Sequence, residues 1–218
     1  MGWGRNLSLE RVSRNLSAPR WWQRSRTLAT ALDAAAYVEE AQGILGEVGE
    51  QDASTTNYQC QAGKIKLNLQ PVELREVIET AIATVRLSLE AKNIQLECML
   101  AALPIIVHGD RDRLQQIILN LLTNAIKFTE AQGRIEVRLD ASETQAEISV
   151  SDNGCGISAE FLPNVFDTFR QESGLKGGLG MGMAIAHNLV ELHGGTIHVQ
   201  SPGIGQGAMF RVMLPLII

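Results

Sequence analysis

The sequence predicts an α/β (α+β) domain built as a two-layer sandwich, in which one mixed sheet carries about three helices on one face. Apolar residues recur at helical spacing in three segments, around residues 71–89, 110–128 and 182–193, and alternate with polar residues in about five shorter segments. Most of the alternating segments are joined in pairs by short polar or glycine-containing turns. Such hairpin signals favour a mostly antiparallel sheet over a strict β-α-β repeat.

The organised region is expected to begin near Gly63. Residues 64–70 alternate and predict a short strand, after which Pro71 is expected to begin the first helix. Residues 94–99 alternate again and predict the next strand. A region in which strand-like alternation and helical spacing follow one another indicates a folded domain, which we place at residues 58–218.

The helix expected at residues 110–128 has an apolar stripe with spacings of three and one, which predicts a single buried face. The stripe consists of Leu114, Ile117, Ile118, Leu121, Leu122, Ala125 and Ile126. Residues 134–140 and 146–151 predict a hairpin. The last helix, 182–193, is closed by two glycines, and strands at 196–201 and 208–214 flank a Gly/Pro turn.

Composition narrows the possible functions. The chain has 218 residues, of which 45% are hydrophobic, so it can bury a core, and its formal net charge of −5 argues against nucleic acid as a partner. No run of 18 apolar residues occurs, so no transmembrane segment is expected. Three widely spaced cysteines are typical of free thiols in a reducing compartment, which favours a cytoplasmic location.

Residues 1–57 differ from the rest of the chain. The first 32 residues hold six arginines and a single acid, Glu10. An Arg- and Ser-rich, acid-poor start is also seen in transit peptides, but we favour a basic, poorly ordered extension. Residues 28–48 are Ala-rich and predict at most one weak helix, followed by a polar linker.

A carboxylate at the end of a predicted strand is the most informative feature of the sequence. Asp152 follows the alternating run 146–151 and opens a glycine turn that contains Gly154 and Gly156. A carboxylate in this position can accept a hydrogen bond from an amine, and glycines let the backbone approach a ligand closely. A glycine turn after a strand is common, so the motif gains its meaning from the elements around it.

The helix at 110–128 carries polar residues beside its apolar stripe. Asn120, Asn124 and Lys127 share one face at spacings of four and three. Amide oxygens suit Mg²⁺, which bridges phosphates, and a lysine can reach a phosphate. The alternative is that both asparagines are solvated or cap nearby backbone, although two asparagines inside a helix carry a propensity cost.

Four motifs in order resemble those of the catalytic, ATP-binding domain of histidine kinases. They are the asparagine box at 120–129, the first glycine box at 152–157, the phenylalanine box at 166–171 and the second glycine box at 178–183. The tail from Glu191 to Leu216 is also similar. The resemblance covers residues 64–216 and implies the Bergerat-type ATP fold, with ATP and Mg²⁺ as cofactors.

The resemblance also implies roles for individual residues. Asp152 is expected to accept from the adenine amine, and Asn124 is expected to coordinate Mg²⁺. Asn120, Lys127 and Arg170 are the expected catalytic residues beside the phosphates, and residues 166–180 form the expected lid. The nucleotide-binding set is completed by Gly154, Gly156, Ile157, Phe166, Phe169, Gly178, Leu179, Gly180 and Gly182.

The expected activity is γ-phosphoryl transfer in two-component signalling, with a histidine-bearing dimerisation domain or a response regulator as partner, in cis or in trans. One feature departs from the family: no histidine precedes His108, so residues 1–57 are either disordered or a degenerate helical hairpin. An ATP-binding regulatory module without transfer activity, or a truncated kinase, is therefore the alternative. Hydrolysis is disfavoured, since Asn120 stands where ATP-hydrolysing relatives carry a glutamate.

Overall fold

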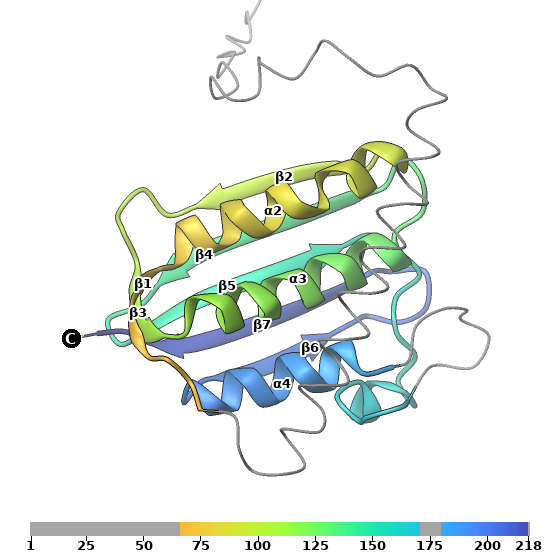
Figure 1. The fold of residues 1–218 in the computed structure, drawn as a ribbon. Helices are drawn as coiled ribbons and strands as arrows, with labels where there is room; N and C mark the ends of the chain where they lie inside the picture. Colours follow the sequence, from red (N-terminus) through yellow and green to blue (C-terminus); the bar gives the residue numbers. More distant parts are fainter. Residues whose placement is uncertain (1–65, 171–179, 218) are drawn as a thin grey trace, which may run out of the picture.

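Three α-helices and seven strands make up the part of the chain that the structure describes, residues 66–170 and 180–217 of a computed structural model (Figure 1). In chain order they are β1 (Gln70–Glu73), α2 (Leu74–Ala91), β2 (Gln95–Leu100), β3 (Ile106–Gly109), α3 (Arg111–Phe128), β4 (Arg134–Ala141), β5 (Gln145–Asp152), a 3₁₀ turn (Leu162–Asn164), α4 (Gly182–Leu192), β6 (Thr196–Gln200) and β7 (Ala208–Pro215). Residues 1–57, expected to form a separate extension, lie outside the described residues.

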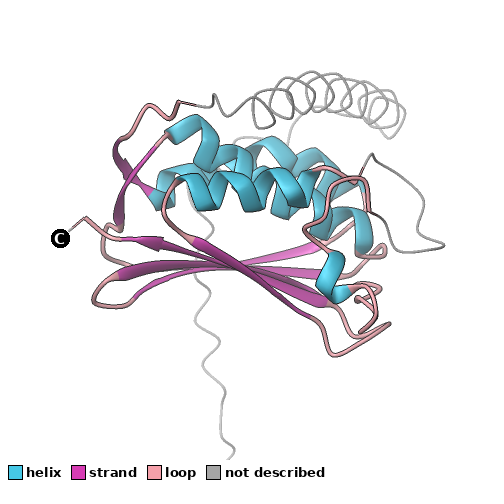
Figure 2. Ribbon diagram, turned by 90° about the horizontal axis from the view of Figure 1, so that it is seen from below, coloured by secondary structure: helices cyan, strands magenta, loops and turns pink. Residues whose placement is uncertain are grey.

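The larger sheet has five strands in the order β2-β4-β5-β7-β6. Only β2 and β4 are parallel, and the other neighbours are antiparallel. All three helices cover the same face of this sheet, as Figure 2 shows. The predicted fold class, a two-layer sandwich with a mixed and mostly antiparallel sheet, is confirmed.

The beginning of the domain differs from the prediction. The strand occupies Gln70–Glu73 in place of residues 64–70, and the helix begins at Leu74 in place of Pro71. β1 pairs antiparallel with β3 as a separate two-stranded sheet, in which Pro71 lies opposite His108. β1, which carries Pro71, lies at the edge of this sheet, where the missing N–H of a proline is tolerated. The four-residue strand β3 was not predicted because it is too short to show alternation.

The core lies between the helices and the inward-facing row of each strand. The apolar stripe predicted for α3 is buried at every one of its seven positions, which confirms it. The inward rows are Ile135, Val137 and Leu139 on β4, Ala146, Ile148 and Val150 on β5, and Phe210, Val212 and Leu214 on β7. Asp152 ends the inward row of β5, so its side chain lies on the helix side of the sheet.

Polar side chains fix both ends of α3. Asp110 caps its N-terminus by accepting from the backbone N–H groups of Asp112 (3.1 Å) and Arg113 (3.2 Å). At the other end, Lys92 Nζ donates to the carbonyls of Ile126 (2.7 Å), Lys127 (3.2 Å) and Thr129 (3.1 Å). These contacts hold the asparagine-bearing helix in place. None of the described helices has the length and apolarity needed to cross a membrane.

Candidate functional site

The Asp152 carboxylate is the polar end of an apolar row. Its Oδ1 accepts the N–H of Gly154 at 2.9 Å, and the backbone N–H of Ala208 also acts to lower the pKa of the carboxylate. Burial raises the pKa of Asp152 above its ordinary value, and the two backbone hydrogen bonds partly offset this. A carboxylate of this kind has acceptor capacity left for a further donor on the helix side of the sheet.

The turn after Asp152 lies against the C-terminal end of α3. The N–H of Cys155 donates to the carbonyl of Phe128 at 3.1 Å. A Cβ atom on Gly154 would lie 2.2 Å from the same carbonyl oxygen, which is closer than any side chain can approach. Only glycine at this position lets the Asp152 turn meet the end of the asparagine helix.

The same turn is held on its other side by a loop between β6 and β7. The N–H of Gly207 donates to Gly154 O at 3.1 Å, and that of Gly205 donates to Cys155 O at 2.6 Å. Gly156 adopts a φ of 67°, and a Cβ there would lie 2.1 Å from Gly203 O. Both predicted glycines of the turn are therefore required for two backbones to pack directly together.

The three polar residues of the α3 stripe have different environments. Asn120 and Asn124 are half-buried, and Lys127 is exposed. The buried Nδ2 of Asn120 has no hydrogen-bond partner among the described residues, so it neither caps backbone nor meets solvent. A Cβ on Gly182 would lie 3.6 Å from Asn120 Oδ1, which places the first turn of α4 beside this amide. The structure therefore brings Asn120 and Gly182 together, as predicted for two residues of one site.

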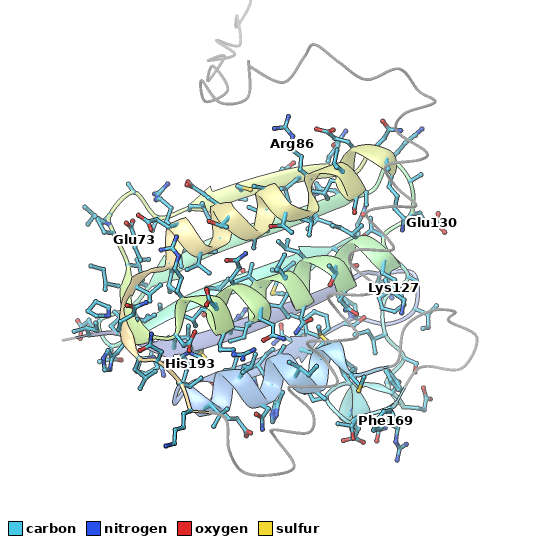
Figure 3. The ribbon with its side chains drawn as sticks, in the orientation of Figure 1. Glu73, Arg86, Lys127, Glu130, Phe169 and His193 are labelled. Carbon is cyan, nitrogen blue, oxygen red and sulfur yellow. The ribbon has the colours of Figure 1, made fainter. Side chains whose placement is uncertain are left out.

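Lys127 lies at the same end of α3 as the Asp152 turn. Its Nζ is 4.6 Å from the centre of the Phe128 ring. Partial burial of the amine lowers the pKa of Lys127, although the residue as a whole is exposed. Figure 3 shows Lys127 and Phe169 at one end of the domain and His193 at the other.

The two phenylalanines predicted to bind nucleotide differ. Phe166 stacks on His187 of α4 at a ring-centre distance of 5.1 Å and meets Phe210 edge-on at 6.5 Å. Phe169 is exposed and has a φ of 61°, and its N–H donates to Gly180 O at 3.2 Å. This bond joins the two ends of the segment 170–180.

Arg170 is exposed, and its Nε lies 3.7 Å from Asp167 Oδ2. Ile157 is half-buried, and its backbone N–H donates to Ser201 Oγ at 3.0 Å. Gly178 and Leu179 lie outside the described residues. No described contact joins Arg170 to the asparagine stripe.

Sequence reasoning did not assign the loop at residues 201–207 to the site. The loop was interpreted as a Gly/Pro turn within the tail that resembles histidine kinases. The sequence does contain a signal for this loop, because Gly203, Gly205 and Gly207 occur at every second position. In the structure their φ angles are 136°, 77° and 72°. A loop with three such glycines cannot be an ordinary hairpin turn. Ser201 was also missed, because a single serine after a strand carries no pattern of its own.

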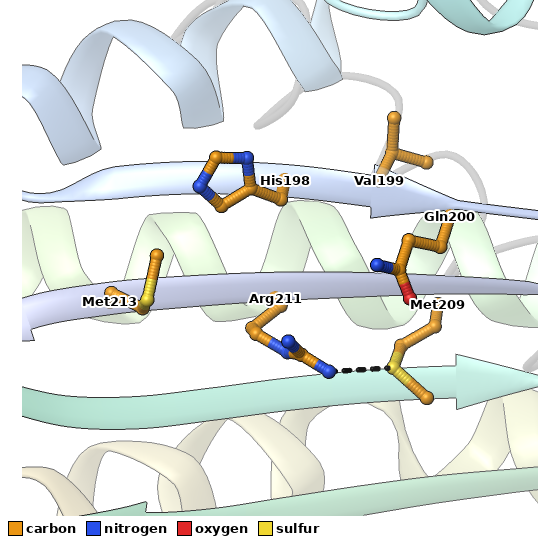
Figure 4. A pocket seen from close by; sticks show the side chains of 6 residues that line it. All are labelled: His198, Val199, Gln200, Met209, Arg211 and Met213. Carbon is orange, nitrogen blue, oxygen red and sulfur yellow. Dashed lines mark hydrogen bonds between the residues drawn. The ribbon is translucent and has the colours of Figure 1, made fainter. Parts of the chain in front are cut away.

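A separate depression lies on the open face of the sheet (Figure 4). It is lined by His198, Val199, Gln200, Met209, Arg211 and Met213. Met209, Arg211 and Met213 alternate with the buried residues of β7, so they belong to the face opposite Asp152. Arg211 is paired with Glu147 at 3.1 Å, and the depression shares no residue with the Asp152 site.

Comparisons with known proteins agree with this arrangement. The family described as "Histidine kinase-, DNA gyrase B-, and HSP90-like ATPase" matches residues 109–218. Hybrid signal transduction histidine kinase D of Dictyostelium discoideum is 32% identical over 189 residues, which cover 71% of this chain and 12% of that protein. Circadian input-output histidine kinase CikA of Synechococcus elongatus is 36% identical over 163 residues, covering 72% of this chain and 22% of that protein.

Solved structures show the same architecture. The mycobacterial sensor histidine kinase MprB aligns with a TM-score of 0.62 at 31% identity, over 67% of this chain and 98% of that one. Full-length ShkA, determined in complex with AMPPNP, aligns with a TM-score of 0.70 at 26% identity, over 87% of this chain and 40% of that one. The matched residues span less than a quarter of each of the two curated relatives above, so the likeness concerns one domain of longer proteins.

Proposed function

The chain belongs to the histidine kinase-, DNA gyrase B- and HSP90-like ATPase family and contains the catalytic, ATP-binding domain of a histidine kinase. We propose that it binds Mg-ATP and transfers the γ-phosphoryl group to a histidine. The acceptor is a histidine on a separate helical domain, because the four histidines of this chain begin at His108, inside the ATP-binding domain. A response regulator is the proposed partner that receives the phosphoryl group next.

The single observation that carries the proposal is the inward-facing Asp152 carboxylate at the end of β5. Its two backbone donors come from Gly154 and Ala208 and leave acceptor capacity for the amine of adenine. Gly154 lets the turn that carries Asp152 pack directly against the Phe128 carbonyl at the end of α3. A base that presents an amine to the Asp152 carboxylate, as adenine does, fits this site better than a base that presents a carbonyl there.

The α3–α4 contact provides groups that fit a triphosphate. The Nδ2 of Asn120 has no hydrogen-bond partner within residues 66–170 and 180–217, and phosphate oxygens are strong acceptors for such a donor. Gly182 begins α4, whose first backbone N–H groups have no partner within the helix and favour anions. Lys127 adds a positive charge in the last turn of α3.

Asn124, one turn after Asn120, is the residue that would hold Mg²⁺ through its amide oxygen. When bound, Mg²⁺ neutralises phosphate charge and orients the γ-phosphoryl group. The contribution of the protein is then to position the nucleotide: Asp152 fixes the base, Asn120 and Lys127 fix the phosphates, and Arg170 approaches the terminal phosphate. No side chain in the site needs to form a covalent bond.

A second candidate is an ATP-binding module without transfer activity. It is favoured by the contacts that two of the histidine rings make within the domain. His193 is buried with both ring nitrogens bonded, and His187 stacks on Phe166. Neither is the proposed acceptor, and in the transfer proposal that role belongs to a histidine on a separate helical domain. Slow hydrolysis is expected in either case, since Asn120 cannot act as a general base.

The test is to incubate the protein with γ-labelled ATP and a separate histidine-bearing helical hairpin domain. Acid-labile label on the hairpin is the expected result, and a hairpin whose histidine is replaced by glutamine is the control. Nucleotide binding without any transfer to several such domains would favour the module, and absence of nucleotide binding by the folded protein would overturn both.

A further inference from the structure

We propose that Ser201 is a positioning residue for the Asp152 carboxylate and, through it, for discrimination of the nucleotide base. The inference rests on the ATP-binding function proposed above and adds a residue outside the four motifs that define the site. Ser201 follows β6 and lies on the far side of the Asp152 turn from α3.

The Ser201 hydroxyl makes as many hydrogen bonds as a hydroxyl can. It accepts from the backbone N–H groups of Ile157 (3.0 Å) and Gly203 (3.3 Å). It donates to the carbonyl of Gly207 at 2.7 Å, with a longer approach of 3.4 Å to the carbonyl of Gly203. One donor and two acceptor positions are thereby filled, so the hydroxyl joins the end of the Asp152 turn to the loop at 201–207.

The contact with Gly207 reaches Asp152 through one peptide group. The carbonyl of Gly207 and the N–H of Ala208 belong to the same planar unit. Ser201 bonds to the carbonyl, and the N–H on the other side of the same peptide group lowers the pKa of Asp152, which favours its charged form. Rotation of this peptide group would break the bond to Ser201 and turn the N–H away from the carboxylate, so the serine fixes the direction of a group that stabilises the carboxylate.

The loop that Ser201 holds packs directly against Asp152. A Cβ on Gly207 would lie 2.0 Å from the backbone oxygen of Asp152, which shows that the loop lies against the residue it holds. The other end of the turn is fixed by the Ile157 N–H on the same hydroxyl. Loss of the hydroxyl therefore loosens Asp152 from two sides, while the contacts of Asn120 and Gly182 are untouched.

The prediction is a selective loss. Adenine presents an amine to the carboxylate, whereas hypoxanthine, the base of ITP, presents a carbonyl at that position. If Ser201 holds Asp152 in place, Ser201→Ala lowers affinity for Mg-ATP by about tenfold and affinity for Mg-ITP by much less. The ratio of the two dissociation constants then moves toward one.

The experiment measures both dissociation constants by calorimetry for the wild type and Ser201→Ala. Ser201→Thr and Ser201→Val form a matched pair of equal shape, of which only threonine keeps the hydroxyl, and they decide the question if the alanine variant does not fold. Ser142→Ala is the control, since the Ser142 hydroxyl bonds to the Gln145 backbone in the β4–β5 turn, on residues outside the site.

The expected result is a reduced ATP/ITP ratio for Ser201→Ala and Ser201→Val and an unchanged ratio for Ser201→Thr and Ser142→Ala. Equal losses for both nucleotides, or an unchanged ratio in the valine variant, would overturn the role of Ser201. A wild-type protein that does not prefer ATP would instead remove Asp152 from base recognition, and with it the proposed function, so the two failures are distinguishable.

Discussion

The backbone N–H of Asp110 donates a hydrogen bond to Nε2 of His193 across 3.1 Å, joining the start of α3 to the end of α4. Because Nε2 accepts, the other ring nitrogen carries the proton, and Nδ1 donates to Leu189 O at 2.7 Å. His193 is buried. The observed role of His193 is to bond two helices together.

His193→Ala is expected to lower the free energy of unfolding by about 1–3 kcal/mol, because it leaves the half-buried Asp110 N–H without this partner. Urea denaturation of the two proteins measures the difference. His198→Ala is the control, since His198 is exposed on the open face of the sheet. Equal effects of the two substitutions would show that the Asp110–His193 bond contributes nothing specific.

Asp152→Asn is expected to reduce Mg-ATP affinity by about 10- to 100-fold, the loss associated with a hydrogen bond to a charged group. The substitution also bears on stability, because burial raises the pKa of Asp152. A raised pKa means that this group favours folding below its ordinary pKa and that this contribution is lost as the pH rises through the folded-state pKa. The free energy of unfolding of the nucleotide-free wild type should therefore fall, relative to Asp152→Asn, across that window.

Calorimetry measures the affinity, and urea denaturation at a series of pH values measures the stability difference. At neutral pH and without nucleotide, the asparagine variant should be at least as stable as the wild type, although it binds Mg-ATP more weakly. A difference in stability that does not change with pH would show that Asp152 is not the group that titrates.

Asn124→Ala is expected to weaken nucleotide binding mainly when Mg²⁺ is present, because an amide oxygen supports the ion and not the base. The measurement is the dissociation constant of ATP with Mg²⁺ and with a chelator in its place. Thr123→Ala, at the preceding position of α3, is the control, since the Thr123 hydroxyl bonds to Leu119 O within the helix. An equal loss under both conditions would remove Asn124 from the metal site.

The helices and the hairpins could be predicted because each repeats its pattern over many residues. The stripe of α3 from Leu114 to Ile126 is long enough to fix both its period and its buried face. β3 has four residues, and the β1–α2 junction at Leu74 depends on pairing with β3. Pairing between distant segments is a tertiary property, so no local pattern indicates where the strand ends and the helix begins.

The site could be predicted as far as its motifs extend along the chain. Asp152 and Asn120 stand in motifs with their own spacing, and in the structure Asp152 bonds to Gly154 and Asn120 lies beside Gly182. Ser201 acts through contacts with Ile157 and Gly207, which become neighbours only when β6 and β7 pair beside β5. A residue whose role is to join two loops leaves no signal in either loop alone.

Gly154 and Gly182 should respond differently to the same added methyl group. In Gly154→Ala the Cβ would lie 2.2 Å from the backbone carbonyl of Phe128, so the turn must move, and we expect a loss of about 1–3 kcal/mol in stability together with a loss of Mg-ATP affinity. In Gly182→Ala the nearest atom is Asn120 Oδ1 at 3.6 Å, an ordinary contact, and alanine in the first turn of α4 should stabilise the protein by about 0.4–1 kcal/mol.

The methyl group of Gly182→Ala nevertheless stands beside Asn120, where the phosphates are proposed to bind. Mg-ATP affinity should therefore fall in this variant although its unfolding midpoint in urea rises, whereas Gly154→Ala should lose both properties. Measurement of Mg-ATP affinity and of urea denaturation on both variants distinguishes the two roles. Gly154 is needed for the fold of the turn, whereas Gly182 is needed only to leave space for the ligand. If Gly182→Ala bound Mg-ATP as tightly as the wild type, the start of α4 would not face the phosphates, and the donor on Asn120 would need another acceptor.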